Sequence, residues 1–521
     1  MRWRGDCLAG ADPVDLPPVD LLVIGGGING AGIARDAAGR GLSVALCEKD
    51  DLAAHTSSAS TKLIHGGLRY LEQYEFRLVA ESLREREVLL RAAPHIVWPL
   101  RFVLPHDRAM RPRWLLRAGL YLYDALGGFG RTLPRSRAIR LDRPPHRPAL
   151  RDELTRGFEY SDCWVEDSRL VVLTAMDARA RGAQVLTRTR CVALERGRSE
   201  WRATLRSIGG ERTIRAKAVA NAAGPWVDEI AGLALGGGTA AHLRLVKGSH
   251  IVVPRSFPGE HAYILQQPDG RIVFAIPYER DFTLIGTTDE PFTGDPDGVR
   301  ISDGEIDYLL AAVGRSFRSG VTRDEIVFSY AGVRPLYEDR ARSAATVTRD
   351  YAFELDTGAG AGDADGSMAP ILSVYGGKIT TFRKLAEHAL ARLAPHLPMA
   401  APWTARAPLP GGDMADFAAF LWQAAGRHPW LPPEMLQRLA RAYGTRIETL
   451  LGGATSLADL GPQVGGTVYE AELRYLVRHE FAMTAEDVLW RRSKLGLHLG
   501  PDAAAGVARW LADNPPADRP A

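Results

Sequence analysis

The chain has 521 residues, of which 46% are hydrophobic and 24% are charged, a balance typical of two or three globular domains with a large buried core. Its formal net charge is +3, from 65 Lys and Arg against 62 Asp and Glu. This near-neutral balance gives no global argument for a nucleic-acid partner, although local basic patches stay possible.

The cysteines and the N-terminal segment predict the cellular compartment of the protein. Cys7, Cys47, Cys163 and Cys191 form no CxxC pair, so we expect no metal site and no thioredoxin-type chemistry, but reduced thiols in a cytosolic protein. Residues 1–18 lack the apolar run of a signal peptide and are predicted to be a flexible leader. No apolar run reaches the roughly 18 residues of a membrane-spanning helix, so a membrane would be met only at its surface.

The first regular elements predict a βαβ unit. A buried-type strand, VDLLVI at 19–24, leads through glycines into a helix at 28–41, and a second strand follows at 42–50. Gly25, Gly27 and Gly30 fit the GxGxxG pattern, which lets the backbone approach a pyrophosphate at a helix N-terminus. Glu48 lies about 20 residues further on, where a ribose hydroxyl is bound. We therefore predict a dinucleotide site rather than a glycine turn with a salt-bridged Glu48, although the motif does not separate NAD from FAD.

Three later segments suit a large dinucleotide held along its length. The segment TSSASTKLIHGG at 56–67 offers clustered hydroxyls and backbone N–H groups, and VANAAGPWV at 219–227 ends a strand in small residues. SVYGGKITT at 373–381 places two glycines before a helix whose N-terminus would favour negative charge on a reduced flavin. Small residues at strand ends are commonly only packing, but together the segments favour this site. The candidate cofactor residues in them are Ser57, Ser58, Ser60, Lys62, Leu63, Ile64, Gly66, Gly224, Gly377, Lys378 and Thr380.

Two helices are predicted between these segments. Residues 76–92 repeat apolar side chains at helical spacing, and residues 113–127 form a second helix, apolar with aromatics and flanked by arginines. For the second helix, packing in the core is the commoner explanation. The more specific hypothesis is an anchor at a membrane surface.

The remaining pattern predicts strands and then a separate helical region. Residues 185–222 alternate like three strands, and residues 263–289 form an antiparallel meander punctuated by PDG and ERD. The low-complexity stretch 357–368 is interpreted as a floppy hairpin tip. We assign a helical C-terminal domain to 405–521.

Four cations and two histidines are candidates for a substrate site. Arg69, Arg334, Arg349 and Lys378 each lie beside glycine or at a strand end, and a phosphate would gather such side chains because arginine matches its oxygens. For any one of them, a solvated surface charge is the commoner explanation. His65 and His250 are candidate bases, because alcohol oxidation needs an acceptor for the hydroxyl proton. Their spacing does not rank them, and a structural histidine is the commoner case.

Taken together, these stretches resemble the FAD-dependent glycerol-3-phosphate dehydrogenases of respiratory chains. The resemblance covers about residues 19–400 in order and extends into the C-terminal region. The motifs that carry it are LLVIGGGINGAGIARDAAGRGLSVAL, TSSASTKLIHGGLRYLEQYEFRLVAESLREREVLL, RGFEYSDCWVEDSRLV, RLVKGSHIVVP, IGTTDEPFTGDP, SYAGVRPL and GGKITTFRKLAEHAL, with YGTRIETLLGG, YEAELRYLVRHE and LWRRSKLGLHL beyond them.

The resemblance implies an α/β fold. Its parts would be a Rossmann-type, glutathione-reductase-like FAD-binding domain, an antiparallel β-sheet substrate domain and an all-α C-terminal cap domain. On this resemblance we assign the FAD-binding domain to 19–105, 161–240 and 365–400, and the substrate domain to 106–160 and 241–364. It implies oxidation of sn-glycerol 3-phosphate to dihydroxyacetone phosphate by hydride transfer to FAD, with electrons passed to a membrane quinone. It also implies a homodimer that is peripheral on the cytoplasmic face of the cell membrane.

By the same resemblance, Arg69, Tyr70, Arg334, Arg349 and Lys378 would bind substrate. His65 and Arg334 would act at the reacting carbon, with His250 as a rival base. The nearest alternative is an oxidase of the same fold that passes electrons to oxygen. An NAD-dependent soluble dehydrogenase is a further alternative that a flavin spectrum would exclude, and near-neutral charge argues against a flavoprotein acting on RNA.

Overall fold

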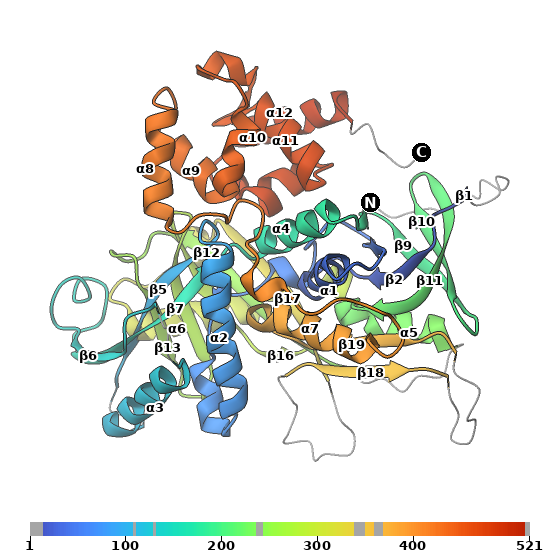
Figure 1. Cartoon of the computed structure of the whole chain (residues 1–521). Helices are drawn as coiled ribbons and strands as arrows, with labels where there is room; N and C mark the ends of the chain where they lie inside the picture. Colours follow the sequence, from blue (N-terminus) through green and yellow to red (C-terminus); the bar gives the residue numbers. More distant parts are fainter. Residues whose placement is uncertain are drawn as a thin grey trace.

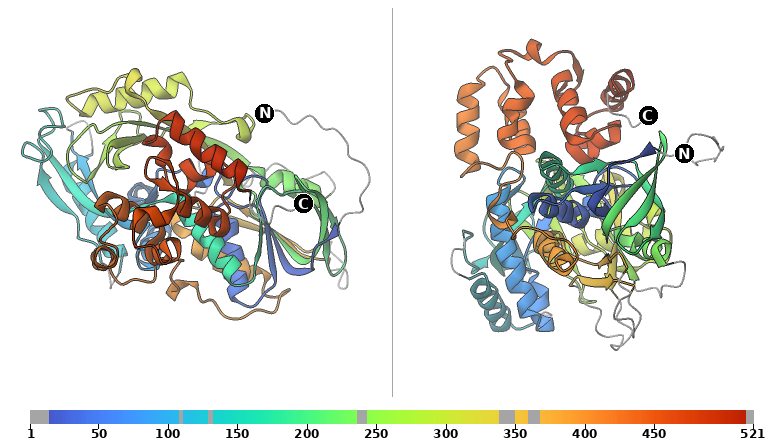
Figure 2. Two further views of the ribbon diagram at one scale, coloured as in Figure 1. Left: turned by 90° about the horizontal axis from the view of Figure 1, so that it is seen from above. Right: turned by 45° about the vertical axis from the view of Figure 1, so that its right-hand side comes forward.

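The computed structural model describes residues 14–107, 111–128, 132–235, 243–337, 350–358 and 368–515. Two large sheets form the body of the molecule, and the C-terminal helices are stacked on one side of it (Figures 1 and 2). Arg349 and Cys7, which the sequence analysis singled out, lie outside the described residues, as do residues 1–13 of the predicted leader and 359–367 of the predicted hairpin tip.

The first sheet has nine strands, with the order β18-β19-β11-β2-β3-β8 along its main path. Strands β19, β11, β2, β3 and β8 pair in parallel, and the β9–β10 hairpin continues from β11. The strands of this sheet are β1 (Val14–Asp15), β2 (Val19–Ile24), β3 (Val44–Cys47), β8 (Gln184–Leu186), β9 (Arg190–Arg196), β10 (Trp201–Ser207), β11 (Gly210–Asn221), β18 (Ala352–Asp356) and β19 (Ile371–Tyr375).

Helices cover the first sheet and fix where its functional edge lies. Leu21, Leu22 and Val23 are fully buried, because a parallel strand covered on both faces reads as a continuous apolar run. The carboxyl ends of β2, β3, β11 and β19 meet at one edge, and the predicted cofactor segments follow these ends. The helices packed on this sheet are α1 (Ile28–Gly39), α4 (Asp167–Ala180), α5 (Val227–Leu235) and α7 (Phe382–Leu393).

The second sheet has ten strands and is antiparallel except for the parallel pair β5–β13. Helices α2 (Phe76–Ala92) and α3 (Arg113–Leu126) pack on one face, and α6 (Asp303–Ser316) packs on the other. The strands are β4 (Leu63–Ile64), β5 (Val97–Pro105), β6 (Arg137–Arg140), β7 (Arg156–Val165), β12 (Leu243–Pro254), β13 (Ala262–Gln266), β14 (Ile272–Tyr278), β15 (Phe282–Gly286), β16 (Glu290–Pro291) and β17 (Phe328–Tyr337).

The C-terminal region has its own apolar core. It contains a π-helical turn, Asp487–Arg492, and one short strand pair, β20 (Gln463–Gly465) with β21 (Val468–Tyr469). The prediction of an all-α domain lacked this pair, because strands of two or three residues give no alternation signal. The helices are α8 (Phe417–Arg427), α9 (Pro433–Tyr443), α10 (Ile447–Leu451), α11 (Glu470–Glu480) and α12 (Pro501–Asp513).

The predicted α/β fold, the βαβ unit, both helices at 76–92 and 113–127, and the meander are confirmed. Val14 and Asp15 fall in the predicted flexible leader but pair with β11 as β1, a long-range contact that local sequence does not reveal. The domain boundaries stay a prediction. Strands of both sheets fall inside the predicted ranges 19–105 and 161–240.

Cys47, Cys163 and Cys191 are free and buried, as expected. Within the described parts of the chain, no helix is both long and apolar enough to cross a membrane.

Candidate cofactor and substrate site

The glycine turn between β2 and α1 has the geometry that a pyrophosphate-binding turn needs. Gly25 has φ +113°, and a Cβ added to Gly30 would lie 1.9 Å from the carbonyl oxygen of Gly25. Any other residue at these two positions would therefore strain the turn or push the helix away from the strand. Ser57 closes over the start of α1, where its hydroxyl accepts the Ile28 N–H at 3.0 Å.

Glu48 lies at the end of β3 and faces this turn. Its side chain is buried, and its carboxylate accepts the Gly26 N–H at 2.6 Å and the Asp50 N–H at 2.8 Å. Burial raises the pKa of Glu48, and the two N–H bonds oppose that rise. A cavity beside Glu48 is lined by Gly25, Gly27, Ala222 and Gly224, so small residues leave room for a nucleotide.

The segment 56–66 runs from this turn towards the second sheet. Lys62 is 1% exposed, and its ammonium donates to Asp167 at 2.8 and 2.9 Å and to the Ser58 carbonyl at 3.0 Å. Ser60 donates to the same carboxylate at 2.8 Å. Asp167, at the start of α4, thus fixes the shape of this loop, and direct contacts of Ser60 and Lys62 with the cofactor stay predictions.

The stretch IHGGLRYL contains the end of β4 and the start of the 3₁₀ helix Leu68–Gln73, and it contacts the segment before α7. The His65 N–H donates to the Thr380 hydroxyl at 3.2 Å, and the Lys378 ammonium lies 3.7 Å from the centre of the Tyr70 ring. Leu63 and Ile64 are buried in β4, and Arg69 is half-buried in the turn that follows. Predicted cofactor and substrate residues more than 300 positions apart are therefore neighbours.

Gly66, in the same stretch, is held by a buried polar chain. Its N–H donates to the Tyr123 hydroxyl at 2.8 Å, and that hydroxyl donates to Asp162 at 2.8 Å. Asp162 is paired with Arg86 at 2.7 Å. Sequence reasoning missed Tyr123 and Asp162, as well as Asp167, because their partners are distant in the chain. Tyr123 was visible only as one aromatic residue of an amphipathic helix.

Arg334 lies on β17, next to the end of β19. Its guanidinium donates to the Thr288 carbonyl at 3.2 Å and the Thr287 hydroxyl at 3.3 Å, and it lies 3.5 Å from Asp289. Gly376 has φ +70°, a backbone conformation that favours glycine. Strand β17 contacts β19, which leads into the Gly377–Lys378 turn.

The two candidate histidines have different surroundings. Burial, together with the charges of Lys378 and Arg86, lowers the pKa of His65 to about 4. Burial, with Lys62 and Arg334, lowers the pKa of His250 well below its ordinary value. Both imidazoles are therefore neutral at pH 7 and able to accept a proton.

The partners of His250 favour a structural place for its ring. Its Nε2 lies 3.0 Å from the Thr61 hydroxyl, and its ring stacks on Tyr330 with centroids 4.8 Å apart. Its Nδ1 has no hydrogen-bond partner among the described residues. The His65 residue keeps some exposed surface, and after burial the charge of Lys378 acts most strongly on the pKa of its ring.

Known proteins with related sequences cover nearly the whole chain. A profile described as "FAD dependent oxidoreductase" matches residues 20–362, and one described as "C-terminal domain of alpha-glycerophosphate oxidase" matches residues 402–516. A glycerol-3-phosphate dehydrogenase of Pseudomonas aeruginosa is 54% identical over 500 residues, which are 95% of this chain and 96% of that protein. The chain belongs to the FAD-dependent glycerol-3-phosphate dehydrogenase family.

Two further members of this family resemble the chain over most of its length. A D-erythritol 1-phosphate dehydrogenase of Brucella abortus is 50% identical, over 94% of this chain and 97% of that protein. The crystal structure of a glycerol-3-phosphate dehydrogenase from Bacillus halodurans, in complex with FAD, superposes with a TM-score of 0.74 at 29% identity. It covers 95% of this chain and 90% of that one.

FAD is the cofactor of this family, and the edge of the first sheet fits it. The turn at Gly25–Gly30, the buried Glu48 and the small residues at Ala222–Gly224 would hold the adenosine and pyrophosphate. The Gly377–Lys378 turn before α7 and the His65–Gly66 backbone would hold the flavin end. These individual contacts stay predictions.

Proposed function

We propose that the enzyme oxidises sn-glycerol 3-phosphate to dihydroxyacetone phosphate and passes the electrons to a membrane quinone. The observation that carries the substrate class is the meeting of Lys378, Tyr70 and His65 beside the predicted flavin end. Such a site offers a cation for a phosphate next to a neutral imidazole for a hydroxyl proton. The names of the family members, which act on phosphorylated polyols, support the same class.

The binding step would use cations from three segments. Lys378 and Arg69 would bind the substrate phosphate with Arg334, and Arg349 stays a further candidate outside the described residues. A phosphate dianion in this place would also offset the positive field that lowers the pKa of His65. Substrate binding would therefore make His65 a stronger base at the moment when a proton has to leave.

The chemical step removes a hydride and a proton from one carbinol group. Bound FAD supplies the hydride acceptor for the hydrogen on C2 of the substrate. His65 would take the proton from the C2 hydroxyl, so that the carbonyl of the product forms. Arg334 would stabilise the developing negative charge on that oxygen. His250 is the alternative base.

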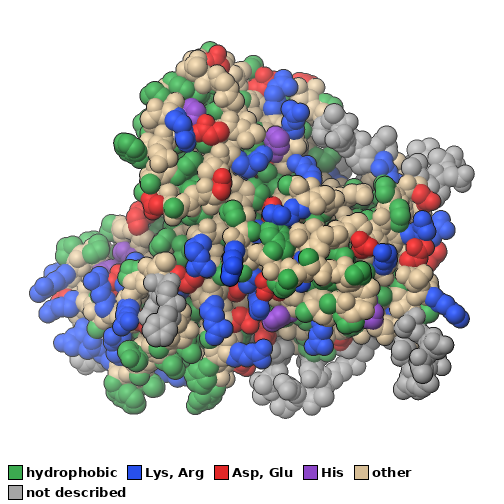
Figure 3. Space-filling view, viewed as in Figure 1, with side chains coloured by type: hydrophobic (Ala, Val, Ile, Leu, Met, Phe, Trp, Pro, Cys, Tyr) green, Lys and Arg blue, Asp and Glu red, His purple; other side chains and the backbone are tan. Residues whose placement is uncertain are grey.

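An exposed apolar patch supports a place at the membrane surface. On and near α3, Trp114 is 72% exposed, Tyr121 65% and Tyr74 80%, with Leu115 and Leu122 more than one-third exposed. Figure 3 shows apolar side chains with arginines beside them in this part of the molecule. Aromatic and basic side chains together suit the headgroup level of an anionic membrane, where a quinone is within reach. A homodimer stays a prediction.

The substrate assignment is tested with the purified holoenzyme and two phosphorylated polyols. We expect kcat/KM for sn-glycerol 3-phosphate to exceed that for D-erythritol 1-phosphate by at least roughly tenfold, because a site fitted to three carbons must strain to admit a fourth. A higher kcat/KM for D-erythritol 1-phosphate would replace the proposed substrate by the longer one while leaving the chemistry unchanged.

A further inference from the structure

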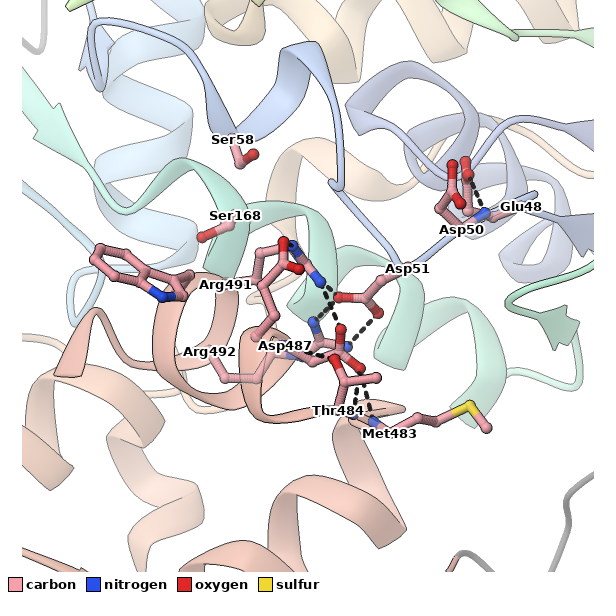
Figure 4. Close-up of polar contacts among 12 residues, drawn as sticks. Glu48, Asp50, Asp51, Ser58, Ser168, Met483, Thr484, Asp487, Arg491 and Arg492 are labelled. Carbon is pink, nitrogen blue, oxygen red and sulfur yellow. Dashed lines mark hydrogen bonds and ion pairs between the residues drawn. The ribbon is translucent and has the colours of Figure 1, made fainter. Parts of the chain in front are cut away.

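Buried charges join the cofactor loop after β3 to the C-terminal domain. Asp51 follows Glu48 by three residues and is 2% exposed. Its carboxylate accepts from Arg491 Nε at 2.6 Å and from Arg492 Nη2 at 2.8 Å (Figure 4). Arg492 is fully buried and also donates to the Glu480 carbonyl at 2.6 Å. The end of the Glu48 loop is thus fixed to the π-helical turn Asp487–Arg492.

A second pairing fixes the same loop from its other side. The Arg188 N–H donates to the Asp50 carbonyl at 2.7 Å, while the Arg188 guanidinium donates to Asp487 at 2.6 Å. Asp487 also accepts from Arg491 at 2.5 Å. Burial alone would raise the pKa of Asp487, but Arg492, Arg188 and Arg491 hold it far below its usual range. The Asp487 carboxylate is therefore stabilised in its charged form by the three arginines.

The second cofactor loop is tied to the same domain through the start of α4. Asp167 holds Lys62, and the next residue, Ser168, accepts from the Lys494 ammonium at 3.2 Å. Arg169 then pairs with Glu480, at 2.9 Å between Nη2 and Oε1. Three consecutive residues of one helix turn thus link the 56–66 loop to the C-terminal domain.

The C-terminal domain also walls a cavity beside this loop. The cavity has a volume of about 370 Å³. One side is formed by Ser58 and Lys62, and the other side includes Trp490, Arg491 and Lys494. Trp490 is itself held by stacking on Phe328 of β17, with ring centroids 4.1 Å apart.

We propose that the π-helical turn Asp487–Arg492 positions the Glu48 loop for FAD, so that the C-terminal domain sets how tightly the cofactor is held. Arg491 and Arg492 act through Asp51 and not by touching the cofactor. A loop freed from this cluster would sample positions in which Glu48 no longer faces the glycine turn, and each productive binding event would carry the cost of ordering it. This inference rests on FAD as the cofactor and not on the identity of the substrate.

The test compares FAD release from the holoenzyme and from two variants that each lack one ion-paired arginine. Arg492→Met removes one of the two arginines that donate to Asp51. Arg438→Met removes an arginine from a close pair, Arg438–Glu472 at 2.6 Å, that lies wholly within the C-terminal domain. Each holoenzyme is diluted into FAD-free buffer, and flavin fluorescence follows release. We expect Arg492→Met to raise the dissociation constant for FAD by roughly tenfold or more, and Arg438→Met to leave it unchanged at a similar loss of thermal stability.

Two further variants keep the result decisive if Arg492→Met does not fold. Asp51→Asn preserves the shape of the side chain and removes its charge, and Arg492→Lys keeps a cation with a poorer match to the carboxylate. We expect weakened FAD binding in Asp51→Asn and partial recovery in Arg492→Lys relative to Arg492→Met. Unchanged FAD affinity in Asp51→Asn, or an equal loss in Arg438→Met, would overturn the proposal.

Discussion

His65 and His250, the two candidate bases, differ in the groups around their rings. Both are neutral at pH 7, but His250 is stacked on Tyr330 and hydrogen-bonded to Thr61, whereas burial and the charge of Lys378 lower the pKa of His65. A phosphate bound at Lys378 would offset part of the positive field at His65. His65 stays the proposed base, with His250 as the alternative.

The low pKa of His65 predicts the acid limb of the reaction. Because this histidine titrates near pH 4 in the folded protein and near 6.5 when free, kcat/KM for flavin reduction should hold down to about pH 5 and fall below it. A fall centred at or above pH 6.5 would contradict the assignment. So would His65→Ala with full rates of flavin reduction, if His250→Ala lost them.

The same shift predicts how stability depends on pH. The folded pKa of His65 lies below the unfolded value, so the unfolded chain binds more protons between about pH 4 and 6.5. The free energy of unfolding should therefore be largest above pH 6.5 and decline as pH falls towards 4. Denaturant titrations across this range would measure it, and replacing His65 by Gln should reduce the slope. An equal slope in the variant would show that other groups cause the decline.

Arg334 gives a matched prediction for substrate binding. Arg334→Ala should raise KM for glycerol 3-phosphate and lower kcat, with a combined loss of about 2–4 kcal/mol if it stabilises the developing charge. Arg323→Ala, which removes an arginine paired with Asp303 on the surface, should change neither constant. Steady-state kinetics with a soluble electron acceptor provide the measurement. An unchanged KM and kcat in Arg334→Ala would contradict the role proposed for Arg334.

At the scale of elements, the two faces of α3 have different surroundings. Its outer face exposes Trp114 and Tyr121, and its inner face buries Tyr123 against Gly66. The sequence left open whether this helix is core or membrane anchor. The structure shows that Leu120 and Tyr123 pack in the core while Trp114 and Tyr121 are exposed, so core packing is confirmed for the inner face and the membrane anchor stays a prediction.

Loss of the Tyr123 hydroxyl should loosen this backbone. In Tyr123→Phe the Gly66 N–H and the Asp162 carboxylate each lose a buried partner, which should cost about 1–3 kcal/mol of stability. We expect slower flavin reduction with little change in KM. Tyr121→Phe, on the exposed face of the same helix, should behave as the unmodified enzyme in thermal unfolding and in stopped-flow reduction, and a similar effect of both changes would refute the role of Tyr123.

The exposed face of α3 should determine membrane binding. Trp114→Ser with Tyr121→Ser should weaken binding to anionic phospholipid vesicles by at least roughly tenfold, since burying one large apolar side chain stabilises by about 1.5–3 kcal/mol. Ile208→Ser removes a comparably exposed apolar residue, 76% exposed on the first sheet, and should bind as before. Vesicle co-sedimentation measures the binding of both variants and of the unmodified enzyme. Equal binding by all three would show that α3 does not form the membrane-binding surface.

Sequence periodicity predicted most elements here but few of their contacts. The glycine turn, the βαβ unit and the helix at 76–92 follow from local patterns of apolar residues and glycine. The contacts of Tyr123 with Gly66, of Lys62 with Asp167 and of Asp51 with Arg492 join positions 57, 105 and 441 residues apart. Such pairings depend on the assembled fold, and no local pattern reveals them.

At the scale of the whole molecule, three parts meet at one edge. The first sheet supplies the cofactor loops, the second supplies β17 with Arg334, and the C-terminal domain fixes the loop that carries Glu48. The apolar patch around α3 and the C-terminal helices lie in different regions of the molecule (Figure 1). The proposed membrane surface and the proposed anchor of the cofactor loop are therefore separate regions that can be tested by separate variants.

Anaerobic mixing of the holoenzyme with sn-glycerol 3-phosphate, followed by addition of an acceptor, tests the proposed reaction most directly. We expect the flavin absorbance to bleach on mixing, and a quinone added in the second step to restore the colour much faster than oxygen does. Faster recovery with oxygen than with quinone would instead assign an oxidase, and a flavin that does not bleach with glycerol 3-phosphate would contradict the proposed function altogether.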